Sequence, residues 1–359
     1  MNFINRITKP VILSVFLLFF QSLQAMPPPI SFTAKHPIFS KDNTKLIYLN
    51  SQNNRHAYKI IQMNTKTGKV IKTVPVKSLN GLSAFAATPD GFKVLAMNPH
   101  GFGVIHNGTG KLLRMLPHPS KIKDWRFTPV QSHDGVLLAI PSIGPPAQKI
   151  FLIHTGSGKV IRSIDVSSKK KTADFLPIIR SIGFNQDRHK VAYLQQDKNS
   201  SSLHIYDIYQ ENEILIIKLP KPYYDYGKIT FSKNGQNILL YNYGTKGITL
   251  VDIIKQSVKT LNYDNSSFVG FTADDKNIII IQPFANSVSI QNIATGVVKR
   301  HSIKLKTNEG DYGWRTVQSA DRTKLALPFK TQNYAKIDRF LILDGNMGQL
   351  IRELKAKKL

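Results

Sequence analysis

A short turn motif, Thr-Gly-Lys or a close variant followed by an apolar segment, recurs along the chain. Clear copies begin at Thr67, Thr109, Ser157, Thr295 and Met347, and degenerate copies lie at Asn212 and Gln256. Successive glycine-equivalent positions, at residues 68, 110, 158, 212, 256, 296 and 348, are 42, 48, 54, 44, 40 and 52 residues apart. Periods of about 40–50 residues with four short strands in each are typical of propeller blades. The spacing therefore predicts an all-β chain that forms a seven-bladed β-propeller of four-stranded antiparallel blades.

The first 25 residues have the features of a secretory signal peptide. Arg6 and Lys9 precede an apolar run over residues 11–20, and residues 23–25 resemble a cleavage site. A membrane span needs about 20 apolar residues, so this run is short for one, although a retained N-terminal anchor is the alternative. We expect cleavage after Ala25, no transmembrane segment in residues 26–359, and a periplasmic or secreted protein.

Turn-forming residues divide residues 26–359, a single predicted propeller domain, into seven units. Asp-Gly, Asn-Gly or related pairs follow the first strand of most units, because glycine accepts a positive φ without steric cost. Carboxylates in these turns, such as Asp134 and Asp274, are expected to bond the local backbone. The predicted blades cover residues 36–76, 82–118, 123–166, 179–220, 226–264, 266–304 and 312–356.

The fourth strand of each unit alternates apolar with basic residues. The basic positions are clearest at Lys72, Arg114, Arg162 and Arg352. Such a strand is expected at the exposed rim of a blade, where basic side chains discourage edge-to-edge pairing between molecules. We favour this structural explanation over a binding surface.

The formal net charge of +27 indicates an anionic partner. A protein or anionic macromolecule of the cell envelope fits, and nucleic acid or anionic lipid are further candidates. The alternative is that these side chains only solvate the surface. The chain has no cysteine, which excludes disulfides, thiolate catalysis and cysteine-bound metal.

The repeats resemble the YVTN-type bacterial propeller repeats, which are distant relatives of the WD-repeat propellers. The matching segments are Thr88-Pro89-Asp90-Gly91, Gly103-Val104-Ile105 and Thr109-Gly110-Lys111-Leu112. The resemblance implies a ring of seven four-stranded blades, often in an exported protein. It implies no catalytic residue, and the Gly-His and Trp-Asp pairs of WD repeats are missing.

A second repeat places cations and aromatic residues before the innermost strands. The candidate ligand-binding residues are Arg126, Arg180, Lys228 and Arg315, with Trp125, Trp314, Tyr226 and Tyr312 beside them. They are predicted to form a basic collar with stacking faces at the mouth of the central channel, because such cations bind carboxylate or phosphate through charge-assisted hydrogen bonds. The alternative is that Asp124, Asp225 and Asp311 neutralise the cations and that the aromatic residues only pack between blades.

No catalytic or metal-binding motif stands out. The ten histidines show no ligand spacing, and no nucleophile elbow or phosphate-binding glycine loop occurs. We therefore expect no cofactor, no metal and no catalytic residue. The sequence favours a non-enzymatic binding or scaffold protein that docks its partner on the loop-rich face. The alternatives are an enzymatic or small-ligand propeller with an anion site at the funnel, and a charge-driven binder of nucleic acid or lipid.

Overall fold

Seven β-sheets, each of four antiparallel strands, form the fold of this chain in a computed structural model. The structure describes residues 37–40, 42–52, 57–76, 84–87, 92–98, 101–117, 129–142, 148–166, 178–197, 200–220, 227–242, 247–263, 266, 268–282, 285–303, 316–330 and 337–355. The predicted signal peptide lies outside these residues. No helix in this described part is long and apolar enough to cross a membrane.

The first four sheets are named blades 1 to 4 in chain order. Blade 1 contains β1 (Ile38–Phe39), β2 (Lys45–Gln52), β3 (Ala57–Asn64) and β4 (Val70–Val76). Blade 2 contains β5 (Ala84–Ala87), β6 (Lys93–Asn98), β7 (Gly101–His106) and β8 (Leu112–Pro117). Blade 3 contains β9 (Val130–Gln131), β10 (Leu137–Ser142), β11 (Lys149–His154) and β12 (Val160–Asp165). Blade 4 contains β13 (Ile178–Phe184), β14 (Lys190–Gln196), β15 (Ser201–Asp207) and β16 (Asn212–Lys218).

The remaining three sheets are blades 5 to 7. Blade 5 contains β17 (Gly227–Phe231), β18 (Asn237–Asn242), β19 (Ile248–Asp252) and β20 (Ser257–Leu261). Blade 6 contains β21 (Phe268–Phe271), β22 (Asn277–Gln282), β23 (Ser287–Asn292) and β24 (Val298–Ser302). Blade 7 contains β25 (Val317–Gln318), β26 (Lys324–Lys330), β27 (Ile337–Asp344) and β28 (Leu350–Lys355).

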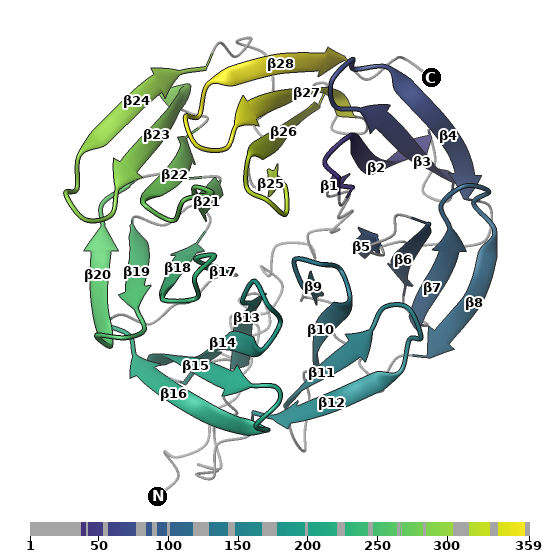
Figure 1. Cartoon of the computed structure of the whole chain (residues 1–359). Helices are drawn as coiled ribbons and strands as arrows, with labels where there is room; N and C mark the ends of the chain where they lie inside the picture. The colour runs from purple at the N-terminus through teal and green to yellow at the C-terminus, as the bar shows by residue number, and fades with distance from the viewer. Residues whose placement is uncertain are drawn as a thin grey trace, which may run out of the picture. The chain divides into compact units, whose positions relative to one another are not determined.

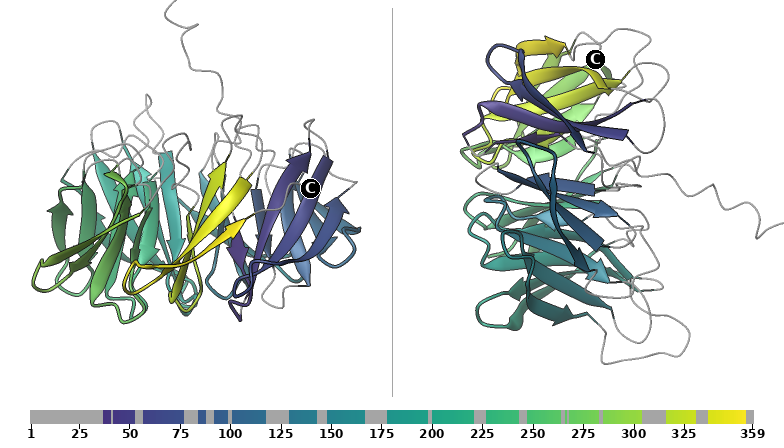
Figure 2. Two further views of the ribbon diagram at one scale, coloured as in Figure 1. Left: turned by 90° about the horizontal axis from the view of Figure 1, so that it is seen from above. Right: turned by 90° about the vertical axis from the view of Figure 1, so that its right-hand side faces the viewer.

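The blades lie around a central axis as a seven-bladed β-propeller (Figure 1), which confirms the predicted fold class. We use the word channel for the region along this axis, between the innermost strands. In every sheet the strands follow chain order, with the first strand innermost and the fourth at the circumference. The side views show strands running between two faces of the ring (Figure 2). We call one of them the turn face; it carries the turns between first and second strands and between third and fourth strands. The opposite face is the loop face.

Apolar side chains between neighbouring blades hold the ring together. The described residues form seven buried clusters, and each joins residues of two adjacent blades. The cluster between blades 7 and 1 closes the ring, with the rings of Tyr48 and Phe340 edge to face at 4.9 Å. Residues 30–34 are also expected to pair with the last sheet and so fasten the ends of the chain, but they lie outside the described residues.

A recurring Ser/Thr-x-Asp motif builds the first turn of most blades. In blade 3, Ser132 Oγ donates to Asp134 Oδ1 at 2.7 Å and accepts a hydrogen bond from the Leu137 amide at 2.9 Å. Asp134 also accepts from the amide of Val136 at 3.1 Å. The same arrangement recurs at Ser40, Thr272 and Ser319. These bonds confirm that turn carboxylates satisfy the local backbone.

The basic residues of the outer strands contact the next blade. The Arg114 guanidinium of blade 2 donates to the carbonyl oxygen of Gly156 in blade 3 at 2.6 Å. Arg162 of blade 3 pairs with Glu211 of blade 4 at 2.5 Å. At these two positions the basic residues have a structural role that the sequence did not predict, a bond to the next blade. Protection of an exposed edge stays a prediction.

Candidate functional site

The predicted basic collar falls mostly outside the part of the chain that the structure describes. Lys228 is described in full, and Arg180 is described by its backbone. Six residues lie outside the described ranges: Trp125, Arg126, Tyr226, Tyr312, Trp314 and Arg315. The geometry of the channel is therefore built from Lys228 and from residues that the sequence did not single out.

Lys228 lies on β17, the innermost strand of blade 5, at its loop-face end. Its Nζ is 5.1 Å from the ring centroid of Phe268 on the neighbouring strand β21, which is within cation–π distance. Burial lowers the pKa of Lys228 to about 8. Among the described residues, Lys228 has neither an ion-pair nor a hydrogen-bond partner, so an anion in the channel would be its natural counter-charge.

Arg180 lies one position away from the place that the repeat suggested. Phe184 pairs with Val191 in blade 4 as Phe231 pairs with Ile238 in blade 5, so the two inner strands can be aligned on these phenylalanines. In that alignment Ser181, not Arg180, corresponds to Lys228. Arg180 instead occupies a bulge between Ile179 and Ser181. A bulge leaves its extra residue unpaired in the ladder, which a count of sequence positions cannot reveal.

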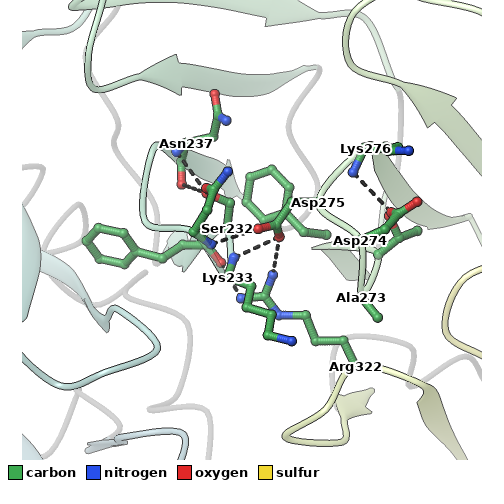
Figure 3. A network of polar contacts seen from close by, with 12 residues as sticks. Ser232, Lys233, Asn237, Ala273, Asp274, Asp275, Lys276 and Arg322 are labelled. Carbon is green, nitrogen blue, oxygen red and sulfur yellow. Dashed lines mark hydrogen bonds and ion pairs between the residues drawn. The ribbon is translucent and has the colours of Figure 1, made fainter.

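A buried polar network joins three blades near the turn-face end of the channel (Figure 3). Arg322 of blade 7 donates from Nη1 to Asp275 Oδ1 of blade 6 and from Nη2 to the Phe231 carbonyl oxygen of blade 5, both at 2.7 Å. Asp275 also accepts from the amides of Lys233 and Asn234, each at 2.7 Å. The side chains of Arg322 and Asp275 are only 2% and 10% exposed. Burial lowers the pKa of Arg322, which Asp275 partly opposes.

The network depends on a turn position with a positive φ, which favours glycine. Gly135 and Gly235 have φ values of 73° and 71° at the fourth position of their turns. Arg188, Asp275 and Arg322 adopt φ values of 67°, 58° and 64° at the same position. A left-handed conformation costs a non-glycine residue about 1–2 kcal/mol. Each of these three side chains bonds an adjacent blade, and Arg188 does so through Asp134 at 2.9 Å.

His133 is neutral at the turn-face end of the channel. Burial and the positive charges of Arg322 and Lys228 lower the pKa of His133 to about 4, and Asp134 only partly opposes this. Arg322 is already paired with Asp275, whereas Lys228 has no ion-pair partner in the part of the chain that the structure describes.

We expect Lys228→Met to stabilise the protein at pH 7 by about 1–2 kcal/mol. Burial disfavours the charged lysine, and partial exposure reduces the effect below the ~3 kcal/mol that the full pKa shift represents. Between pH 8 and 10.5 the unfolded chain holds a proton that the folded chain has lost. The free energy of unfolding of the wild type therefore rises with pH, and the stability difference between Lys228→Met and the wild type becomes smaller. Urea unfolding at several pH values measures this. Lys233→Met, at an exposed turn position, is the control. If the stability of both variants and of the wild type changed with pH in the same way, the lowered pKa of Lys228 would be contradicted.

The described residues hold no group of three or more His, Asp or Glu side chains that could bind a metal. The geometry that does exist is therefore that of a partly buried cation in a channel, next to an aromatic ring. Such a site can bind a carboxylate, a phosphate or an acidic side chain. The sequence could have indicated the buried Arg322, because an arginine follows Asp321 at the position that is glycine in the Asp-Gly turns.

No protein-family model matches the chain, and no curated protein matches its sequence. Solved structures do match. Hydrazine synthase of Kuenenia stuttgartiensis gives a TM-score of 0.60 at 16% identity, over 90% of this chain and 99% of that chain. The β-propeller domain of Cps50 (Swd1) of Myceliophteria thermophila gives a TM-score of 0.58 at 12% identity, over 84% of this chain and 95% of that chain. At these identities the likeness shows the propeller fold alone.

Proposed function

We propose that this chain is an exported propeller of the YVTN type that binds an anionic partner, a protein or another macromolecule of the cell envelope, on its loop face. The observation that carries the proposal is Lys228, a partly buried cation at the loop-face end of the channel with no ion-pair partner among the described residues. A cation that burial destabilises gains most from an incoming anion. The net charge of +27 adds long-range attraction for the same class of partner.

The turn face is less suited to bind a partner, which supports the choice of the loop face. Its turns bond their own backbone and the next blade, as at Ser132, Asp134 and Asp275. Polar groups that are already satisfied gain little from a ligand. Binding residues on a propeller concentrate in the loops of a rigid scaffold, and the loop face carries the longer connections of this chain.

A pull-down from envelope extract tests the proposal, with the mature chain as bait. We expect wild type and Lys233→Met to retain a discrete partner through a high-salt wash, and Lys228→Met to lose most of it. Equal retention by Lys228→Met would contradict a role for the channel cation. Heterogeneous anionic material that high salt removes would instead favour the charge-driven binder of nucleic acid or lipid. Sequencing of the exported protein from its N-terminus tests cleavage after Ala25.

One observation keeps an enzymatic propeller as the second candidate. A solved structure named for an enzyme, hydrazine synthase, has the same fold. Fold does not determine function, so this likeness transfers no activity. A thermal-shift screen of small carboxylates and phosphates would favour this candidate if one compound stabilised wild type and left Lys228→Met unchanged.

A further inference from the structure

Blade 4 holds a row of three hydrogen-bonded polar side chains on two adjacent strands. Ser202 Oγ lies 2.8 Å from His204 Nε2, and His204 Nδ1 lies 2.5 Å from Glu213 Oε1. Ser202 and His204 are two residues apart on β15 and therefore face the same side of the sheet. Glu213 pairs with Tyr206, which also lies on that side. The row is the Ser-His-carboxylate order that activates a serine for attack.

The imidazole of His204 is held in one orientation. The ring of Tyr193 stacks on it at 4.8 Å with an interplanar angle of 12°, and His204 is only 8% exposed. The Tyr193 hydroxyl donates to Glu213 Oε1 at 2.8 Å, which fixes the carboxylate as well. A carboxylate only accepts hydrogen bonds, so His204 must carry its proton on Nδ1. Nε2 is then an acceptor, directed at the hydroxyl of Ser202.

We propose that Ser202, His204 and Glu213 form a nucleophilic site that hydrolyses carboxylic esters with a short acyl group. Ser202 Oγ forms a bond to the ester carbonyl carbon while its proton moves to His204 Nε2. The bond to the leaving oxygen breaks, and His204 returns the proton to the departing alcohol. Water then gives a proton to His204 and its oxygen to the acyl carbon; Ser202 is released and takes the proton back. Glu213 holds the imidazole and stabilises its protonated form.

The neighbours of Ser202 suit this reaction. Gln195 on β14 and Lys218 on β16 are the residues directly opposite Ser202, and opposite residues project from the same side of a sheet. An amide and an ammonium group beside the nucleophile can donate to the oxyanion that forms on the carbonyl oxygen. Ile216, opposite His204, is 53% exposed and offers a small apolar surface for the acyl group. Ser202 itself is partly exposed and within reach of a substrate.

A fluorophosphonate probe tests the proposal on the purified mature chain. Such a probe forms a bond between its phosphorus and an activated serine, with loss of fluoride. We expect one adduct, mapped by peptide mass spectrometry to Ser202, and slow hydrolysis of p-nitrophenyl acetate. Ser202→Ala should lose both. His204→Gln should slow labelling by roughly 100-fold, since a general base contributes about 10²–10⁴-fold.

The controls separate activation of the serine from an effect on folding. Ser200→Ala removes an exposed hydroxyl two residues away, which donates to Asp197 at 3.4 Å, and it should label like wild type. Glu213→Gln should slow labelling by at least roughly 10-fold while the unfolding transition stays cooperative, because the amide can hold the wrong tautomer. The mapping of the wild-type adduct needs no variant to fold. No adduct, or adducts spread over several serines, would overturn the proposal. Its failure would leave binding at Lys228 untouched.

Discussion

Replacing Arg322 by methionine is expected to lower the free energy of unfolding by about 3–5 kcal/mol. Arg322 and Asp275 form an ion pair at 2.7 Å in which the side chains are 2% and 10% exposed. Removing one partner leaves the carboxylate buried without its cation, which is costly in a medium that water does not reach. The variant also leaves the Phe231 carbonyl oxygen without the donor that Nη2 provides. The loss should appear in urea unfolding at pH 7.

Arg188→Met is the matched control for this prediction. Arg188 occupies the same turn position with a φ of 67°, against 64° for Arg322, so methionine has the same backbone cost at both sites. Its ion pair with Asp134 joins side chains that are 32% and 35% exposed. Pairs of this kind contribute about 0–1 kcal/mol. Equal losses for both variants would show that the turn conformation, not burial of the ion pair, governs stability here.

The repeat structure could be predicted from the sequence because each blade repeats its own local chemistry. Turn residues such as Ser132 and Asp134 bond backbone groups only a few positions away. Local bonds of this kind require the same residue types in each turn, so a motif recurs along the sequence. The four-stranded blades and their number follow from that pattern, and the structure confirms them.

The contacts between blades could not be predicted in the same way. Arg322 reaches Asp275, its equivalent one blade away, at 47 positions and Phe231 at 91 positions along the chain, and the repeat period does not show which side chains meet. Ser202, His204 and Glu213 belong to neighbouring strands, but their meeting depends on the register of β15 with β16 and on a bulge between Ile205 and Tyr206. A bulge also displaces Arg180 by one position. Register and bulges are properties of the sheet rather than of any local sequence motif.

The sequence predicted the kind of binding site, a cation beside an innermost strand, but only some of the residues that form it. Lys228 was singled out because it precedes an inner strand, and it lies on that strand in the channel. The absence of an ion-pair partner for Lys228 among the described residues was not predictable from the sequence, which places Asp225, a residue outside the described ranges, only three positions away. The positive charges that lower the pKa of His133 come from other blades, which no local sequence motif reveals.

Gly110→Ala is expected to destabilise the protein by about 2–5 kcal/mol, although the same change is mild in another blade. Gly110 lies in the turn between β7 and β8 with a φ of 70°. A Cβ atom there would stand 2.1 Å from the carbonyl oxygen of Pro75 and 2.8 Å from a methyl carbon of Val74, both on β4 of blade 1. A backbone oxygen cannot move aside alone, so the two blades must separate. The cost adds about 1–3 kcal/mol of overpacking to the strain of a left-handed alanine.

Gly296→Ala isolates the contribution of the contact between blades. Gly296 occupies the equivalent turn of blade 6 with a φ of 75°, and a Cβ atom there would meet nothing within 4 Å. Both glycine amides donate to the residue four positions earlier, at 2.8 Å for Gly110 and 3.0 Å for Gly296, so the turns themselves match. We expect Gly296→Ala to cost only the conformational term of about 1–2 kcal/mol in urea unfolding. If both substitutions cost the same, glycine in this motif serves the turn alone, and the close packing of blade 2 against blade 1 contributes little to the stability of the ring.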